Sequence, residues 1–246
     1  MDNNKLKEIN MFLFKRFSIL IAAAVLIVST AAAQNNQREM SVEESYLQES
    51  MEMMIIRETA RAYSREQKLI SLEYISDAIE RGSTNDEIRQ TLEFLSREGR
   101  MIQARTNGRL DNNFPDVRRQ AAKYLGLLGT EEAHRSLLDI CRYENEPLVI
   151  QEAIKSLGDI GTNENGETVA HISYIFMRFD GTNPDNLMAI ATIDAFEKIA
   201  RANDGLNSQE AIRVLGRITE GQYINPVKER ARLLLAELRS YGNNNN

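Results

Sequence analysis

The side chains able to do chemistry are few and scattered along this chain. Histidine occurs only as His134 and His171, and Cys141 is the single cysteine. Neither histidine has another histidine or a cysteine at the spacing that zinc sites use, so we predict no metal and no cofactor. The sequence also lacks a glycine-rich phosphate loop, a Gly-x-Ser-x-Gly elbow and a Cys–His nucleophile arrangement. We therefore expect a protein that is not an enzyme.

The remaining reactive groups have structural explanations. Cys141 shares an apolar helical stripe with Leu137, Leu138 and Ile140. This pattern predicts a small, buried hydrophobic side chain, with a reactive thiol as the alternative. The carboxylate pair Glu131–Glu132 falls where a helix should begin, and negative charge there favours the helix dipole.

The best candidate for binding is a set of polar side chains on the faces opposite three apolar stripes. His171, Tyr174 and Arg178 share one face of an expected helix at i, i+3 and i+7. The expected helices before and after it add Arg135, Asp139, Arg142, Arg213 and Arg217. Stacked helices would combine these residues into a cationic, aromatic-tipped groove that suits an acidic peptide segment. The alternative is an ordinary solvated face on which Arg135 pairs with Asp139.

The elements that must position these residues are predicted by an internal repeat. The frame Ala-x3-Leu-Gly-x-Leu/Ile-Gly occurs at residues 121–129 and again 32 residues later, at 153–161. Looser copies follow at spacings of 39, as Thr192, Phe196, Ile199 and Ala200 and as Ala231, Leu235, Ala236 and Leu238. Recurrence at this period predicts an all-α fold, an α-solenoid of antiparallel helix pairs.

Glycine and proline fix the phase of the repeat. Gly126 and Gly158 cost about 1 kcal/mol each in a helix interior relative to Ala, and close approach of a neighbouring helix would justify them. Gly129 and Gly161 fall where a left-handed helix cap is expected. The four prolines, each read as marking a helix start, are Pro115, Pro147, Pro184 and Pro226.

The repeat, together with the composition of the two ends of the chain, divides the sequence into five predicted segments. They are a signal peptide at 1–33, a polar linker at 34–40, N-terminal helices with a divergent first repeat at 41–114, clear repeats at 115–241 and a disordered tail at 242–246. Capping boxes are predicted at Ser41–Glu44, Thr84–Glu87 and Asn207–Glu210. The first box opens a helix to about residue 63. Its apolar residues at roughly helical spacing are Leu47, Met51, Met54, Ile55 and Ala62. Residues 99–113 are expected to be a long excursion between repeats, and a last single helix spans 226–241.

Residues 117–129 and 149–161 resemble the HEAT-like repeats of phycobilin lyases, which carry the pattern Val-x3-Ala-x3-Leu-Gly-x-Ile-Gly. The resemblance covers residues 115–240 well and 65–100 weakly. It implies a right-handed superhelix whose second helices line the concave side. Thr192, Glu197 and Ala200 depart from the pattern, which leaves the crossing of the later repeats open. Such a pattern specifies fold much more than function.

The first 33 residues predict an export signal. A basic pair, Lys15 and Arg16, precedes a short apolar run at 17–28, and small residues lead to an Ala-x-Ala site ending at Ala33. The run is shorter than the roughly 20 residues that span a bilayer, so we expect only transient contact with the membrane. Uncleaved anchoring is the alternative, and Met11 is the expected true start. The mature protein should be periplasmic or extracellular.

The formal net charge of -6 makes nucleic acid a poor partner. We therefore expect an exported, non-catalytic scaffold or adaptor that binds protein partners, with acidic segments as the favoured class. Two alternatives stay open. One is a self-assembling structural component of the cell envelope. The other, which the resemblance implies, is a chromophore lyase or chaperone, although an export signal disfavours that role.

Overall fold

The computed structural model describes residues 41–181 and 184–244, so the predicted signal peptide and linker lie outside the described residues. The chain divides into two compact units, residues 1–50 and 51–246. Helix α2 (Val42–Arg61) begins in the first unit, at the predicted capping box, and its residues 51–61 belong to the second unit. The Ser41 N–H donates to Glu44 Oε2 at 3.0 Å, and the Glu44 N–H donates to Ser41 Oγ at 3.2 Å.

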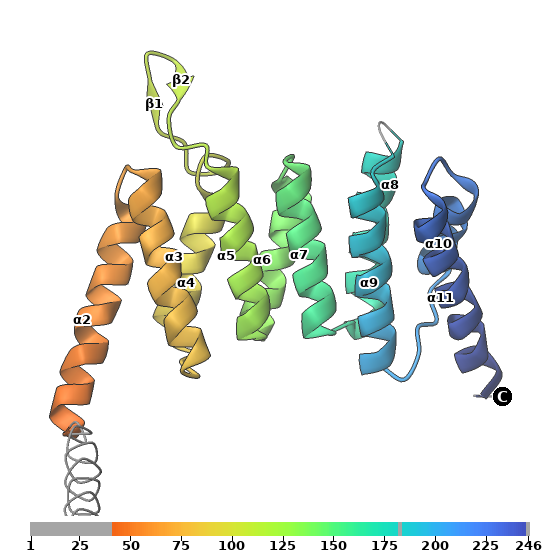
Figure 1. Ribbon diagram of the computed structural model, residues 1–246, viewed down its shortest axis with the longest axis horizontal. Helices are drawn as coiled ribbons and strands as arrows, with labels where there is room; N and C mark the ends of the chain where they lie inside the picture. Colours follow the sequence, from red (N-terminus) through yellow and green to blue (C-terminus); the bar gives the residue numbers. More distant parts are fainter. Residues whose placement is uncertain (1–40, 182–183, 245–246) are drawn as a thin grey trace, which may run out of the picture. The chain divides into compact units, whose positions relative to one another are not determined.

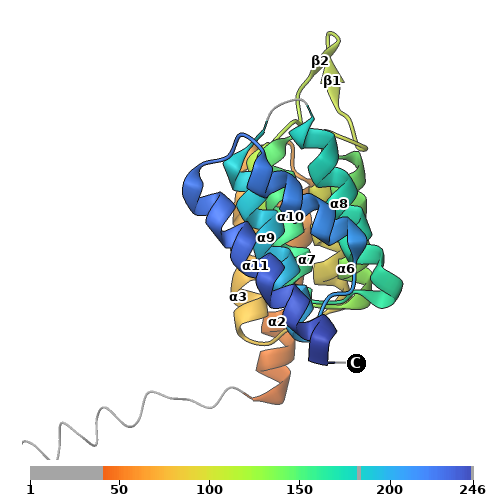
Figure 2. The same ribbon diagram turned by 90° about the vertical axis from the view of Figure 1, so that its right-hand side faces the viewer.

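The second unit is a stack of helix pairs in two layers. The first helices of the pairs contact one another in chain order: α3 (Arg65–Glu80), α5 (Pro115–Leu128), α7 (Pro147–Ile160), α9 (Asn186–Ala202) and α11 (Asn225–Asn244). The second helices form the other layer: α4 (Asp86–Arg97), α6 (Glu131–Tyr143), α8 (Glu167–Asp180) and α10 (Gln209–Glu220). Figure 1 shows the first helices side by side, and Figure 2 looks along the stack, with α9 and α11 to the left of α6 and α8. The predicted HEAT-like α-solenoid is confirmed.

Close contact between first helices explains the interior glycines. A Cβ at Gly126 would lie 2.5 Å from the Ser156 Cβ, and one at Gly158 would lie 2.6 Å from the Ala195 Cα. Real Cβ atoms essentially never approach that closely, so only glycine fits. The predicted reason for these two residues is therefore confirmed.

The later repeats use a different contact. Glu197 stands where the earlier frames have glycine, and it forms an ion pair with Arg230 of α11 at 3.3 Å. Asp194 pairs with the same guanidinium at 2.5 Å. Ala236 holds the equivalent position in the last copy of the frame, but it makes no such contact, because α11 is the last helix described and Ala236 is exposed.

Several helix boundaries differ from the predicted ones. Asn85, and not Thr84, caps α4 by accepting from the Glu87 N–H at 2.8 Å. Ser208, and not Asn207, caps α10 by accepting from the Ala211 N–H at 3.2 Å. Asx and Ser side chains one residue nearer the helix reach the free N–H groups better.

The start of α9 and both ends of α11 also differ from the predicted boundaries. Pro184 precedes the N-cap residue Asp185 and so lies outside α9. Helix α11 starts one residue before Pro226 and continues to Asn244, so the predicted disordered tail is wrong for residues 242–244. Residues 245–246 lie outside the described part of the chain.

The buried side of α2 was predicted in the wrong phase. Leu47, Met51 and Met54 are exposed, whereas Met53, Ile56 and Ala60 are buried. Hydrogen bonds from α3 explain why this side of α2 is the buried one. The Lys68 Nζ donates to the Ala60 carbonyl at 2.8 Å, and the Ser71 Oγ donates to the Ile56 carbonyl at 2.8 Å.

The predicted excursion at 99–113 contains a small hairpin. Strands β1 (Arg105–Thr106) and β2 (Arg109–Leu110) are antiparallel, and in Figure 1 the hairpin projects beyond the helix ends. Asn107 and Gly108 connect the strands with φ of 52° and 82°, which matches the left-handed pair that two-residue hairpins favour. At its base, the buried Asn112 donates to the Ile102 carbonyl at 2.8 Å.

Among the described helices, none combines the length and the apolar character required to cross a bilayer.

Candidate functional site

The predicted binding residues lie on α6, α8 and α10, whose solvent-exposed side we call the second-helix face. Three of them meet where α6 passes α8. The Arg142 Nη2 lies 3.0 Å from the His171 Nε2, and the Arg178 Nη1 donates to the Arg142 carbonyl at 3.4 Å. Because a guanidinium can only donate, the contacting nitrogen of His171 is the acceptor in this arrangement.

Neutral groups orient this cluster. Arg178 also donates to the Glu144 carbonyl at 3.4 Å, and its guanidinium lies 5.0 Å from the Phe179 ring centroid. Carbonyls and an aromatic ring hold the cation without cancelling its charge. Tyr174, one turn before Arg178, is 65% exposed. The arrangement offers charged donors beside an exposed aromatic ring.

Other predicted members of the face are already paired with carboxylates. Arg135 forms its ion pair with Glu131 at 2.6 Å, so the predicted pairing with Asp139 is wrong. Glu131 and Asp139 both lie four residues from Arg135 on α6. An i, i+4 pair is more stable when the acidic residue comes before the basic one, and this order favours Glu131. Arg217 donates through Nε to Asp180 at 2.6 Å, and that carboxylate is buried.

Arg213 and Asp139 occupy the two ends of the face. Arg213 is exposed one turn before Arg217 on α10. Asp139 is half-buried and lines a small cleft between α4 and α6 together with Arg97, Arg100 and Tyr143. The Arg100 Nη2 donates to the Tyr143 carbonyl at 3.0 Å. Arg97 and Arg100 were not predicted as part of the face, although the run of arginines from 97 to 109 was a visible signal.

Buried carboxylates at the ends of second helices are a second feature that sequence reasoning missed. Glu98 follows α4, Glu144 follows α6 and Asp180 ends α8, and all three are buried. A negative charge at a helix C-terminus opposes the helix dipole, so each needs compensation. Nearby donors provide it: Lys68 Nζ lies 2.8 Å from Glu98, Arg118 Nε lies 2.6 Å from Glu144, and Arg217 and Tyr223 bind Asp180.

The buried ion pairs hold the stack rather than a ligand. Arg118 also donates to the Asn113 Oδ1 at 2.9 Å and to the Glu98 carbonyl at 3.3 Å, so one guanidinium joins the ends of α4, α5 and α6. Losing one partner of such a pair leaves an uncompensated buried charge, at a cost of about 3–5 kcal/mol.

Cys141 is buried as predicted, and its burial raises the pKa of the thiol to about 12. A thiol so far from ionisation is a poor nucleophile. Within residues 41–181 and 184–244, no three His, Cys, Asp or Glu side chains are grouped so that they could hold a metal ion.

Residues 102–172, from the hairpin to the first part of α8, match the family profile of HEAT repeats. The chain carries HEAT-like repeats. HEAT repeats are generally protein-interaction scaffolds, and the fold is typically non-catalytic. Searches of curated proteins and of solved structures gave no match to this chain. The likeness to phycobilin lyases remains a resemblance in sequence.

Proposed function

We propose that this HEAT-like repeat protein is a non-catalytic scaffold that holds an acidic segment of a protein partner on the second-helix face. The cluster of Arg142, His171 and Arg178 carries the proposal. Its guanidinium groups rest on carbonyl oxygens and rings, so they remain available to carboxylates, which form the strongest hydrogen bonds with arginine. The exposed ring of Tyr174 adds the kind of aromatic surface that interfaces favour.

The wider charge of the chain makes this face selective. The protein is acidic overall, with a formal net charge of -6, so an acidic segment is repelled from most of the surface. Attraction is confined to places where arginines are grouped. Binding of this kind weakens as added salt screens exposed charges.

We further propose that the scaffold acts outside the cytoplasm after removal of residues 1–33. The support is the sequence of that segment: a basic pair, a short apolar run and an Ala-x-Ala site.

The test removes the three arginines of the face that form no ion pair with a carboxylate of the described residues. A triple variant, Arg142→Gln, Arg178→Gln and Arg213→Gln, is titrated with a fluorescein-labelled Glu-rich peptide, and anisotropy is measured. Arg217 is left in place because its loss would strand the buried Asp180. We expect the affinity to fall at least about tenfold, since charged hydrogen bonds contribute about 1.5–3 kcal/mol each.

The matched control removes three cations from the exposed side of the first helices: Lys123→Gln, Lys155→Gln and Arg239→Gln. It changes net charge equally and should bind the peptide as the unmodified protein does. Equal losses in both triple variants would mean that only overall charge matters. Undiminished binding by the first variant would remove the second-helix face from the proposal.

A further inference from the structure

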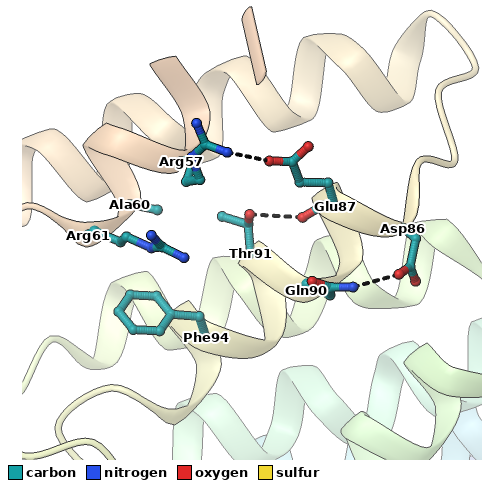
Figure 3. A pocket seen from close by; sticks show the side chains of 8 residues that line it. All are labelled: Arg57, Ala60, Arg61, Asp86, Glu87, Gln90, Thr91 and Phe94. Carbon is teal, nitrogen blue, oxygen red and sulfur yellow. Dashed lines mark hydrogen bonds and ion pairs between the residues drawn. The ribbon is translucent and has the colours of Figure 1, made fainter. Parts of the chain in front are cut away.

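A pocket of about 520 Å³ lies between the second half of α2 and the start of α4, apart from the second-helix face (Figure 3). All of its lining residues come from these two helices: Arg57, Ala60, Arg61, Asp86, Glu87, Gln90, Thr91 and Phe94. Its volume falls in the range of ligand sites, about 300–1,000 Å³. With walls on two sides only, it is a trough rather than an enclosed cavity.

The acidic residues of the pocket are already compensated. Glu87 accepts from the Arg57 Nη1 at 3.4 Å. Asp86 accepts from the Arg89 Nε at 2.8 Å and from the Gln90 Nε2 at 2.6 Å. These contacts lower the pKa of Asp86, which therefore stays an ionised partner of Arg89. The two carboxylates do not face the trough as bare negative charges.

Arg61, unlike these charged residues, has no ion-pair partner among the described residues. It is the last residue of α2, and it is exposed. Figure 3 shows its guanidinium directed into the pocket, between Thr91 and the ring of Phe94. A carboxylate entering the trough would find this cation unpaired.

The rest of the trough complements a peptide around such a carboxylate. The apolar parts of the lining are the half-buried ring of Phe94 on α4 and the methyl group of Ala60 on α2, across the pocket (Figure 3). Gln90 donates through Nε2 to Asp86, and Thr91 donates to the Glu87 carbonyl at 2.8 Å. The Gln90 Oε1 and the Thr91 hydroxyl oxygen can therefore act as acceptors for backbone N–H groups.

We propose that this trough binds a short acidic peptide segment, with a carboxylate on Arg61 and an apolar or aromatic side chain on Phe94. A small-molecule carboxylate is the less suitable occupant, because small-molecule sites bury most of their ligand and this trough is open along its length. The site is independent of the second-helix face. The trough would bind a separate acidic partner, or it would be a second binding site for the partner of the second-helix face.

The test is an NMR titration of the full chain with the peptide acetyl-Gly-Glu-Phe-Glu-Gly-amide. We expect saturable shifts of backbone amides at residues 57–61 and 90–94. Arg61→Gln should weaken binding about tenfold, the usual effect of losing one charge-assisted hydrogen bond. Arg239→Gln removes the same charge from an exposed site on α11 and should leave the affinity unchanged. Phe94→Leu keeps an apolar side chain but removes the ring, and it should weaken binding several-fold, with folding checked by circular dichroism.

Three results would overturn the proposal. The peptide with Gln in place of Glu would bind equally well if charge were irrelevant. Arg61→Gln and Arg239→Gln would have the same effect if the peptide only sensed net charge. Phenylpropionate, which has a ring and a carboxylate but no backbone, would bind as tightly as the peptide if the trough were a small-molecule site. The variants of the second-helix face should leave the shifts at residues 57–61 and 90–94 unchanged, so the two proposals fail separately.

Discussion

At the scale of single residues, His134 is held in one tautomer by two hydrogen bonds. The Thr168 hydroxyl donates its only proton to the Thr162 carbonyl at 2.7 Å. The His134 Nε2, 2.9 Å from that hydroxyl oxygen, must therefore be the donor. Burial lowers the pKa of His134 from its ordinary value of 6.5, because charging the ring in this site costs solvation energy.

This lowered pKa predicts a stability change in mild acid. Below about pH 6.5 the unfolded chain takes up a proton on His134, while the folded chain resists it until the pH reaches its lower pKa. The contribution is therefore fully present above pH 6.5 and is lost as the pH falls below it, by at most about 1.4 kcal/mol per pH unit. Urea unfolding at several pH values measures the loss.

The matched variant for this prediction is His134→Gln. Glutamine keeps an amide donor near the Thr168 hydroxyl but does not titrate. Its free energy of unfolding should fall less between pH 7 and 5.5 than that of the unmodified protein. Parallel pH profiles for the two proteins would show that His134 does not contribute.

At the scale of elements, replacement of glycine by alanine is expected to have opposite effects at two helical positions, Gly158 in α7 and Gly216 in α10. Gly158→Ala gains helix propensity, about 1 kcal/mol, yet its Cβ would meet the backbone of Ala195 at 2.6 Å. Helices α7 and α9 must then move apart, and overpacking of this kind costs about 1–3 kcal/mol. We expect a net loss of stability in urea unfolding.

Gly216→Ala is the control for that loss. Gly216 lies inside α10, and a Cβ there would meet no atom within 4 Å. The same substitution should therefore stabilise the protein by up to about 1 kcal/mol. Stabilisation by both substitutions would contradict the close contact between α7 and α9.

How much of this structure could be predicted from the sequence depends on the range of the forces involved. The helix pairs, the glycine contacts and the αL caps follow from spacing within one or two repeats, and they were predicted. The turn at Asn107–Gly108 was also a local signal and was overlooked. The phase of α2 was not local, because apolar residues occur on two of its sides and hydrogen bonds from Lys68 and Ser71 select one.

The candidate site shows the same division. Helical periodicity placed His171, Tyr174 and Arg178 on one helix face. It did not determine which arginines remain available for a partner. Arg217 is bound by Asp180, 37 residues away, and Arg118 by Glu144, 26 residues away. Such pairs depend on how the repeats stack and on the paths of the loops. They therefore cannot be predicted from residue spacing in a single sequence.

At the scale of the whole stack in residues 51–246, each helix depends mainly on its neighbours. Helix α7 packs between α5 and α9, whereas α11 contacts α9 and α10 and has no later described helix beside it. Stability in such arrays is approximately a sum of nearest-neighbour terms. We expect native-state hydrogen exchange to be slowest in α5 and α7 and faster in α11.

A pair of leucines on α11 tests this dependence. Leu234 is buried and Leu233 is 63% exposed. Leu234→Ala should cost about 2–4 kcal/mol and speed amide exchange in α9, α10 and α11, while exchange in α3 and α5 changes little. Leu233→Ala should leave exchange unchanged throughout, because it removes no buried contact. If Leu234→Ala sped exchange equally in every helix, the stack would unfold as one cooperative unit, and the sum of neighbour terms would not describe it.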